Sequence, residues 1–100
     1  MRDKKQYTKE SLIRREVRDD GENSFTYELL MKESNKLTSY GLPLYSIRVG
    51  FTDKNGIFTS AEIKEAFADA GKAILFFEKL TRNLATPIDV AYIMEDELMQ

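Results

Sequence analysis

The sequence contains no cysteine, no histidine and no tryptophan among its 100 residues. The absence of cysteine excludes disulfides, thiolate metal sites, iron–sulfur clusters and cysteine nucleophiles. The absence of histidine removes the commonest general base and the commonest transition-metal ligand of proteins. An enzyme would have to use carboxylates, lysine, tyrosine or serine. The composition therefore favours a non-enzymatic protein with no catalytic residues, no cofactor and no metal site.

Long apolar runs are missing as well. The longest is Ala73–Phe77, whereas a helix that crosses a bilayer needs about 20 predominantly apolar residues. The charged N-terminus has no apolar stretch behind it, so it does not have the pattern of a signal peptide. The sequence predicts a cytoplasmic protein without a membrane anchor.

Charge is distributed unevenly, although the formal net charge is only −2. Residues 1–18 hold seven Lys or Arg against three Asp or Glu, and residues 89–100 hold four acidic residues and no basic one. A basic terminus is typical either of nucleic-acid contact or of a solvated arm. We expect residues 1–9 to be a disordered arm and residues 10–100 to form one α+β domain.

Apolar and polar residues alternate in three segments, which is the pattern of half-buried β-strands. The alternation is weak in residues 12–18, and clear in residues 25–32 and 45–52. The turn-forming segment Asp19–Asn23 separates the first two strands. Asp53–Gly56 follows the third and ends in an Asn-Gly pair, which favours a hairpin.

Residues 57–67 are compatible with two structures. Alternation from Ile57 to Ile63, together with the preceding hairpin turn, favours a strand. Ser60 as a cap, followed by good helix formers, favours a helix. We predict a strand.

The segment from Asp53 to Glu62 also spaces its acidic and amide side chains as the loop of a calcium-binding EF-hand does. The first ligand position of such a loop falls on Phe51, whose side chain offers no oxygen. We therefore expect no calcium site here.

The last third of the chain has helical periodicity. Apolar residues recur at intervals of three and four from Ala70 to Leu84, after an N-cap residue at Asp69. The segment Thr86–Asp89 then offers a second N-cap, a proline for the first helical position and an acid three residues after the cap. We expect two helices.

These elements predict an α+β fold, with a four-stranded antiparallel meander sheet followed by two C-terminal helices packed on one face. The apolar rows of residues 25–31 and 45–51 are expected to receive Ile74, Phe77 and Leu80 of the first helix. The opposite face is expected to be mostly in contact with water and to carry Arg14, Glu28, Lys32, Arg48, Glu62 and Lys64.

Four short segments carry a resemblance to a known family. They are Phe25-Thr-Tyr-Glu-Leu, Tyr40-Gly41 before Tyr45-Ser-Ile-Arg-Val, Phe76-Phe77-Glu-Lys-Leu80, and Thr86-Pro-Ile-Asp-Val90 followed by Glu95-Asp96. From about residue 12 to residue 98 the chain resembles a family of small uncharacterised Firmicutes proteins, known only as a domain of unknown function. The resemblance implies a strand-rich start and a helical end. It implies no activity, ligand or catalytic residue.

The predicted water-facing side of the sheet also carries apolar side chains, because the alternation places Leu12, Leu30 and Phe58 there. Brought together by neighbouring strands and rimmed by charge, they would form a patch suited to contact. The candidate contact surface consists of Leu12, Arg14, Leu30, Lys32, Arg48 and Phe58.

Two functions follow as hypotheses. The first is a small interaction or accessory protein that forms a homodimer through this face or an adjoining edge strand. The alternative is a nucleic-acid-binding module that uses the basic residues of this face and the N-terminal arm. Acidic residues on the same face weigh against the alternative.

Overall fold

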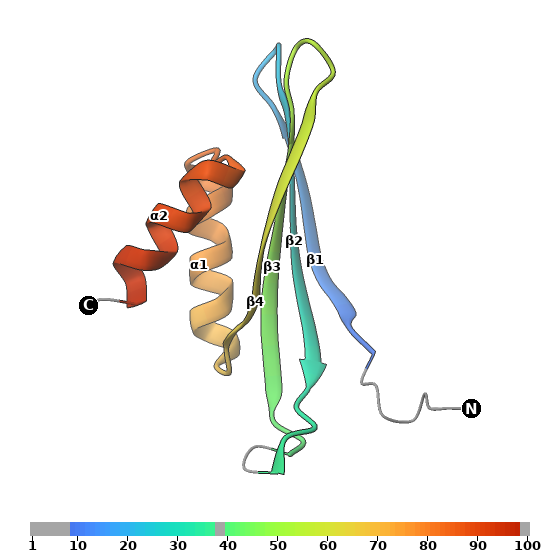
Figure 1. Cartoon of the computed structure of the whole chain (residues 1–100), viewed down its shortest axis with the longest axis vertical. Coiled ribbons are helices and arrows are strands. Elements are labelled where there is room, and N and C mark those ends of the chain that lie inside the picture. The colour runs from blue at the N-terminus through green and yellow to red at the C-terminus, as the bar shows by residue number, and fades with distance from the viewer. Residues whose placement is uncertain (1–8, 38–39, 99–100) are drawn as a thin grey trace.

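The structure is a computed structural model that describes residues 9–37 and 40–98, with side chains described as far as residue 93. The elements are β1 (Ser11–Asp19), β2 (Ser24–Glu33), β3 (Pro43–Thr52), β4 (Phe58–Phe67), α1 (Ala70–Arg82) and α2 (Pro87–Leu98). The strands form an antiparallel sheet in the order β1-β2-β3-β4, and both helices lie against one face of it (Figure 1). The predicted α+β fold is confirmed, and the ambiguous segment is a strand. Of the predicted disordered arm, residues 1–8 lie outside the described residues.

The predicted Asn-Gly turn joins β3 to β4. Gly56 has a positive φ of 83°, which glycine adopts without steric cost. The N–H of Gly56 donates to the carbonyl of Asp53 over 2.9 Å. Asp53 Oδ1 accepts from the backbone N–H groups of Asn55 and Ile57, both at 2.9 Å. This carboxylate thus shapes the hairpin by binding its backbone.

The core lies between the sheet and the helices, as the alternation predicted. Tyr27, Leu29, Ile47 and Val49 from the two central strands are almost completely buried. Burial of such side chains stabilises the fold by roughly 1.5–3 kcal/mol each. The residues of α1 that complete the core are Ala73, Phe76, Phe77 and Leu80.

The buried stripe of α1 is rotated from the predicted one. Ile74 was expected in the core but is 36% exposed, whereas Phe76 is only 4% exposed. The reason is the end of β4, which passes beneath the first half of α1. There the rings of Phe67 and Phe76 pack with their centroids 5.4 Å apart.

A buried hydrogen bond ties the sheet to the connection between the helices. The hydroxyl of Tyr27 donates to the carbonyl of Ala85 over 2.8 Å. Immediately after it, the N–H of Asp89 donates to Thr86 Oγ1, and the N–H of Thr86 donates to Asp89 Oδ2. This reciprocal pair is the predicted start of the second helix, and the Tyr27–Ala85 bond holds that start against the sheet.

We expect this protein to lose stability between pH 10 and pH 12 because of Tyr27. Burial raises the pKa of the Tyr27 phenol to about 12. The fold favours the neutral phenol. Its contribution to the free energy of unfolding is therefore complete below the pKa of the unfolded state, about 10, and is lost as the pH rises through the pKa of the folded state. Below pH 10, Tyr27→Phe should be about 1 kcal/mol less stable than the wild type, because it lacks the hydrogen bond. Between pH 10 and pH 12 its free energy of unfolding should fall by roughly 2–3 kcal/mol less than that of the wild type, because it has no phenol to ionise. Urea denaturation of both proteins between pH 8 and 12 measures the difference, and identical pH profiles would disprove it.

Candidate functional site

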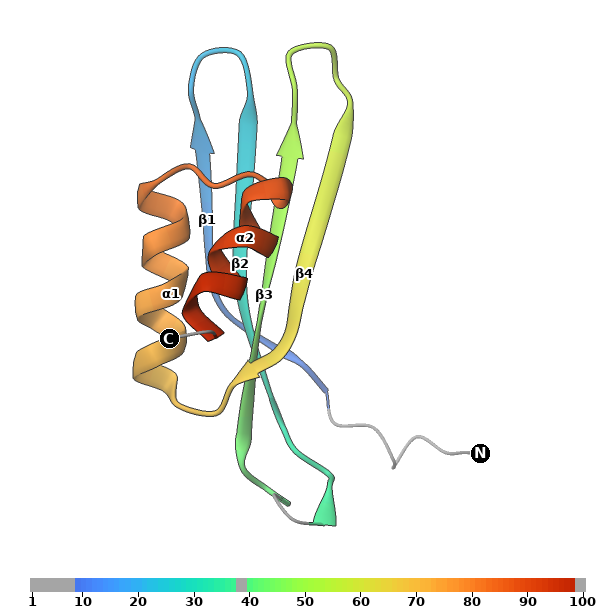
Figure 2. The same cartoon turned by 60° about the vertical axis from the view of Figure 1, so that its left-hand side comes forward.

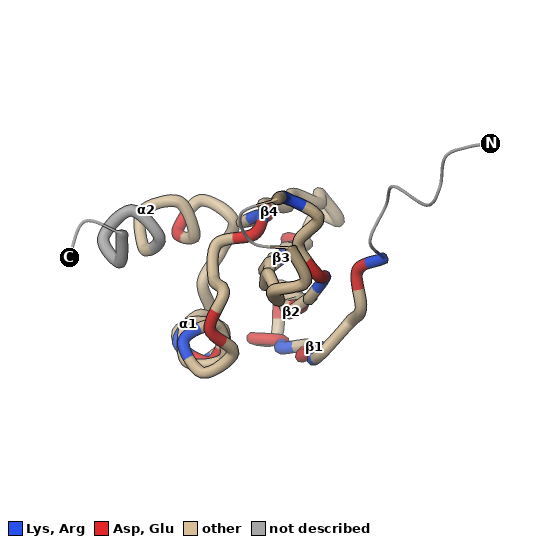
Figure 3. The backbone as a smooth tube through the Cα atoms, turned by 90° about the horizontal axis from the view of Figure 1, so that it is seen from below, with Lys and Arg blue, Asp and Glu red and all other residues tan. Residues whose placement is uncertain are grey.

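The face of the sheet opposite the helices is the first candidate site. Seen end-on, α1 and α2 lie on one side of the strands, and no helix of the described residues covers the other side (Figure 3). Strand register arranges the side chains of this open face in rows. The rows are Leu12–Leu30–Ser46, Arg15–Glu28–Arg48–Glu62 and Val17–Thr26–Gly50–Ser60.

The middle row is a ladder of opposite charges. Arg48 Nη1 lies 3.0 Å from Glu28 Oε1, and Arg48 Nη2 lies 3.8 Å from Glu62 Oε2. Arg15 Nε approaches the second oxygen of Glu28 at 3.7 Å, and Glu10 reaches Arg48 at 3.8 Å. The positive charge of Arg48 is therefore matched by carboxylates within the same chain.

The second predicted cation, Lys32, is also paired. Its Nζ lies 2.7 Å from Glu65 Oε2, and the ammonium lowers the pKa of Glu65. Glu65 sits in an irregular part of β4 with a positive φ of 51°. Its N–H donates to the buried hydroxyl of Ser46 over 2.9 Å. Three residues of β4, 64–66, here stand opposite one residue of β3, and this bulge turns Glu65 toward Lys32.

Arg14 is not on the open face, contrary to the prediction. The register of β1 shifts between Leu12 and Arg14, so that Arg14 stands opposite the core residue Leu29. Its guanidinium lies 3.0 Å from Glu78 of α1 and 5.2 Å from the centroid of the Phe77 ring. A β-bulge of this kind moves every later side chain of the strand to the other face.

The new position gives Arg14 a structural role at the edge of the core. Its guanidinium also binds Glu16 at 2.7 Å and thereby lowers the pKa of Glu16. Glu16 in turn accepts from Arg18 at 2.6 Å. These side chains form a charged strip beside α1, where the helix side of β1 would otherwise meet water.

The three apolar candidates do not form one patch. Leu12 and Leu30 are direct cross-strand neighbours, but Leu30 is only 7% exposed and Leu12 is 52% exposed. Phe58 stands opposite Thr52, six positions along β3 from the Ser46 that pairs with Leu30. The row of charges described above lies between them.

Phe58 belongs instead to an uncharged region near the hairpin ends. A Cβ atom at Gly50 would lie 3.0 Å from Phe58 Cε1, so the ring rests directly on the glycine backbone. Phe58 remains 63% exposed, and Val17 in the adjoining row is 59% exposed. Thr26, Gly50 and Ser60 complete a region without charge on the open face.

The two edges of the sheet differ in how they are protected against pairing. Charged side chains and bulges are the usual protection of an edge strand. β1 has a bulge and the arginines Arg15 and Arg18. β4 has its bulge only in the second half, and its first four residues, Phe58–Ala61, carry no charge. Figure 2 shows the outer edge of β4 clear of both helices.

The edge segment Phe58–Ala61 was not among the predicted site residues apart from Phe58. An available signal was the uncharged run Ile57-Phe58-Thr59-Ser60-Ala61 directly after the Asn-Gly turn. The predicted meander already made this strand an edge, and the structure confirms the strand order; the position of the bulge, which leaves Phe58–Ala61 regular, was not predictable from alternation.

The described residues contain no group of three or more His, Cys, Asp or Glu placed to hold a metal ion. Neither α1 nor the described part of α2 is long and apolar enough to span a membrane.

Comparison with known proteins places the chain in a family. Residues 6–100 match the Family of unknown function (DUF6514). The chain belongs to this family. No match was found among curated proteins or among solved structures. The family supplies no activity, so a functional argument has to come from the surface itself.

Proposed function

We propose that this chain is a non-enzymatic cytoplasmic interaction protein that acts as a homodimer, in which β4 pairs antiparallel with β4 of a second copy. The observation that supports it is the segment Phe58–Ala61 at the edge of the sheet, which carries no charge and lies clear of both helices (Figure 2). Pairing across a two-fold axis would give those backbone groups hydrogen-bond partners. The result is a continuous sheet that runs through both copies.

The side chains of β4 favour a register with the two-fold axis at Ala61 over one with the axis at Glu62. A two-fold axis through Ala61 places Ser60 opposite Glu62 of the second copy, and Thr59 opposite Ile63. It also places Phe58 opposite Lys64, which suits a cation–π contact. An axis through Glu62 would bring two carboxylates face to face, and such like-charged pairs are destabilising.

A cysteine scan tests this register cleanly, because the chain has no cysteine of its own. In the proposed dimer the two Ala61 Cα atoms are about 4.5–5.5 Å apart, a separation that a disulfide spans. Ala61→Cys should therefore form a covalent dimer under mild oxidation. The control is Val17→Cys on β1, which is 59% exposed and should stay monomeric on a non-reducing gel.

A matched pair of charge variants tests the same interface without a covalent cross-link. Ala61→Lys places two ammonium groups on the axis and should convert the dimer to a monomer by light scattering. Ser60→Lys faces Glu62 of the second copy and should leave the dimer intact. A wild-type protein that is monomeric at all concentrations, or equal cross-linking at Val17 and Ala61, would overturn the proposal.

Nucleic-acid binding, the alternative, has less support. Lys32 is bound to Glu65, Arg48 is bound to Glu28, and Arg14 lies beside α1. Binding to phosphates requires cations that are available to replace counterions. The proposal is therefore limited to protein contact.

A further inference from the structure

We propose that Asn55 is a site of covalent modification by water, namely deamidation through Gly56, and that the side chain of Asp53 slows this reaction in the folded protein. Asn55 and Gly56 are both exposed and lie in the turn between β3 and β4. Figure 2 shows this turn at the end of the sheet, beyond both helices. The modification requires no second copy of the chain, so it is independent of the proposed dimer.

The reaction joins the side chain of Asn55 to the backbone of the next residue. A base in solution removes the proton of the Gly56 amide, and the nitrogen then attacks Asn55 Cγ. The new C–N bond closes a five-membered imide, and the bond from Cγ to Nδ2 breaks. The nitrogen takes up a proton from water and leaves as ammonia. Water then opens the imide at either carbonyl, which leaves aspartate or β-linked isoaspartate at position 55.

The surroundings of Asn55 make both reacting groups available. Gly56 has no side chain, and a Cβ atom built there would meet no atom within 4 Å, so solvent can reach the attacking nitrogen. The side-chain amide of Asn55 makes no hydrogen bond to another residue that the structure describes. By contrast, the amide of Asn23 donates to a carboxylate at 3.1 Å, and the amide of Asn83 donates to a backbone carbonyl at 2.9 Å.

The hydrogen bonds of the turn oppose the reaction. The N–H of Gly56 donates to the carbonyl of Asp53 over 2.9 Å, which retains the proton that has to leave. Asp53 Oδ1 accepts from the N–H groups of Asn55 and Ile57, both at 2.9 Å, and so holds the backbone on both sides of the reacting nitrogen. The nitrogen can approach Asn55 Cγ only when the turn opens. The rate of modification therefore reports how often this turn opens.

A comparison of folded and unfolded wild-type protein tests both parts of the proposal. Native protein should deamidate at Asn55 at least about tenfold more slowly than the same chain in urea, because the reaction requires local opening. Both samples are incubated in the same mildly alkaline buffer, and mass spectrometry of their peptides measures conversion at residue 55. An unmodified Asn55 in the unfolded chain would disprove the site, and equal rates in the two samples would disprove the protection.

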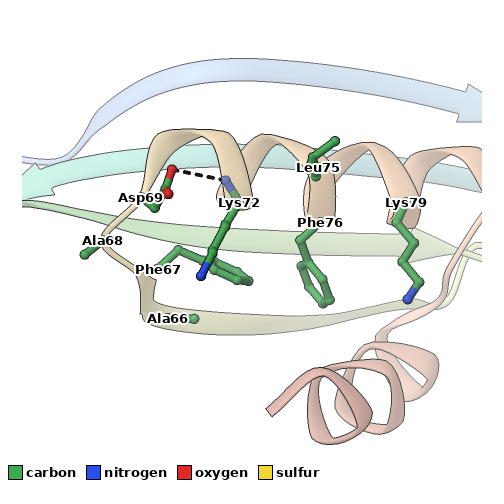
Figure 4. A pocket seen from close by; sticks show the side chains of 8 residues that line it. All are labelled: Ala66, Phe67, Ala68, Asp69, Lys72, Leu75, Phe76 and Lys79. Atoms are coloured by element: carbon green, nitrogen blue, oxygen red, sulfur yellow. Dashed lines mark hydrogen bonds between the residues drawn. The ribbon is translucent and has the colours of Figure 1, made fainter. Parts of the chain in front are cut away.

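A matched pair of variants tests the role of Asp53. Asp53→Ala should deamidate at Asn55 roughly five- to thirtyfold faster than native wild type, as expected for the loss of two exposed hydrogen bonds. The control is Asp69→Ala, because Asp69 Oδ1 accepts from two N–H groups in the same way, that of Lys72 among them (Figure 4). It removes the same charge at the start of α1 and should leave the rate at Asn55 unchanged. Equal rates in the two variants would overturn the proposal.

Discussion

Phe77→Ala is expected to lower the free energy of unfolding by about 3–5 kcal/mol. Phe77 is fully buried in the middle of α1, where its ring also supports the guanidinium of Arg14. Truncation removes the buried ring, leaves a cavity between helix and sheet, and removes that cation–π contact. Ile47→Ala, on the sheet side of the same core, should cost about 2–5 kcal/mol. Urea denaturation followed by circular dichroism measures both.

The control for this experiment lies two residues away on the same helix. Leu75 is 68% exposed, so Leu75→Ala should change the stability by less than about 1 kcal/mol. Where Phe77→Ala prevents folding altogether, Phe77→Leu keeps most of the volume and should cost less. Equal denaturation midpoints for Phe77→Ala and Leu75→Ala would mean that α1 is rotated from its described position.

The second large effect is expected at Leu30, on the face without helices. Leu30→Lys should destabilise the protein by about 2–4 kcal/mol. The substitution removes a buried apolar side chain and places an ammonium group at a position that is largely shielded from water. Leu30 is only 7% exposed although it lies on the open face. Its burial makes it a structural residue of that face, with little area to offer a partner.

Leu12 provides the comparison, because it is the cross-strand neighbour of Leu30 and is 52% exposed. Leu12→Lys should change the unfolding free energy by no more than about 0.5 kcal/mol. A Leu30→Lys protein as stable as Leu12→Lys would show that the open face of the sheet is more accessible than described.

Local patterns were sufficient to predict the strands and helices. The alternation around Tyr27 and Ile47 indicated which side of β2 and β3 is buried, since successive side chains of a strand point to opposite faces. The helix N-caps at Asp69 and Thr86 were also predictable from the sequence, because their hydrogen bonds join residues two or three positions apart. The Asn-Gly turn was predictable for the same reason.

The candidate surface was predicted less well than the fold. Lys32 and Arg48 lie on the open face as expected, but each has a carboxylate partner that alternation does not reveal. Phe58 was placed correctly on that face and wrongly grouped with Leu30. The predicted meander made β4 an edge strand, as the structure confirms, but the sequence pattern did not show that the bulge of β4 lies beyond Phe58–Ala61.

By itself, the sequence determined the identity of each element, the buried rows of the central strands and the absence of cysteine and histidine chemistry. These properties depend on composition and on interactions between residues close in the chain. Only the tertiary structure decided that Arg14 faces α1, that Glu65 turns toward Lys32, and that Phe76 replaces Ile74 in the core. The first two depend on bulges, which one strand forms against the hydrogen-bonding register of its neighbour. The third depends on how α1 rotates to fit the end of β4, a packing choice between residues distant in sequence.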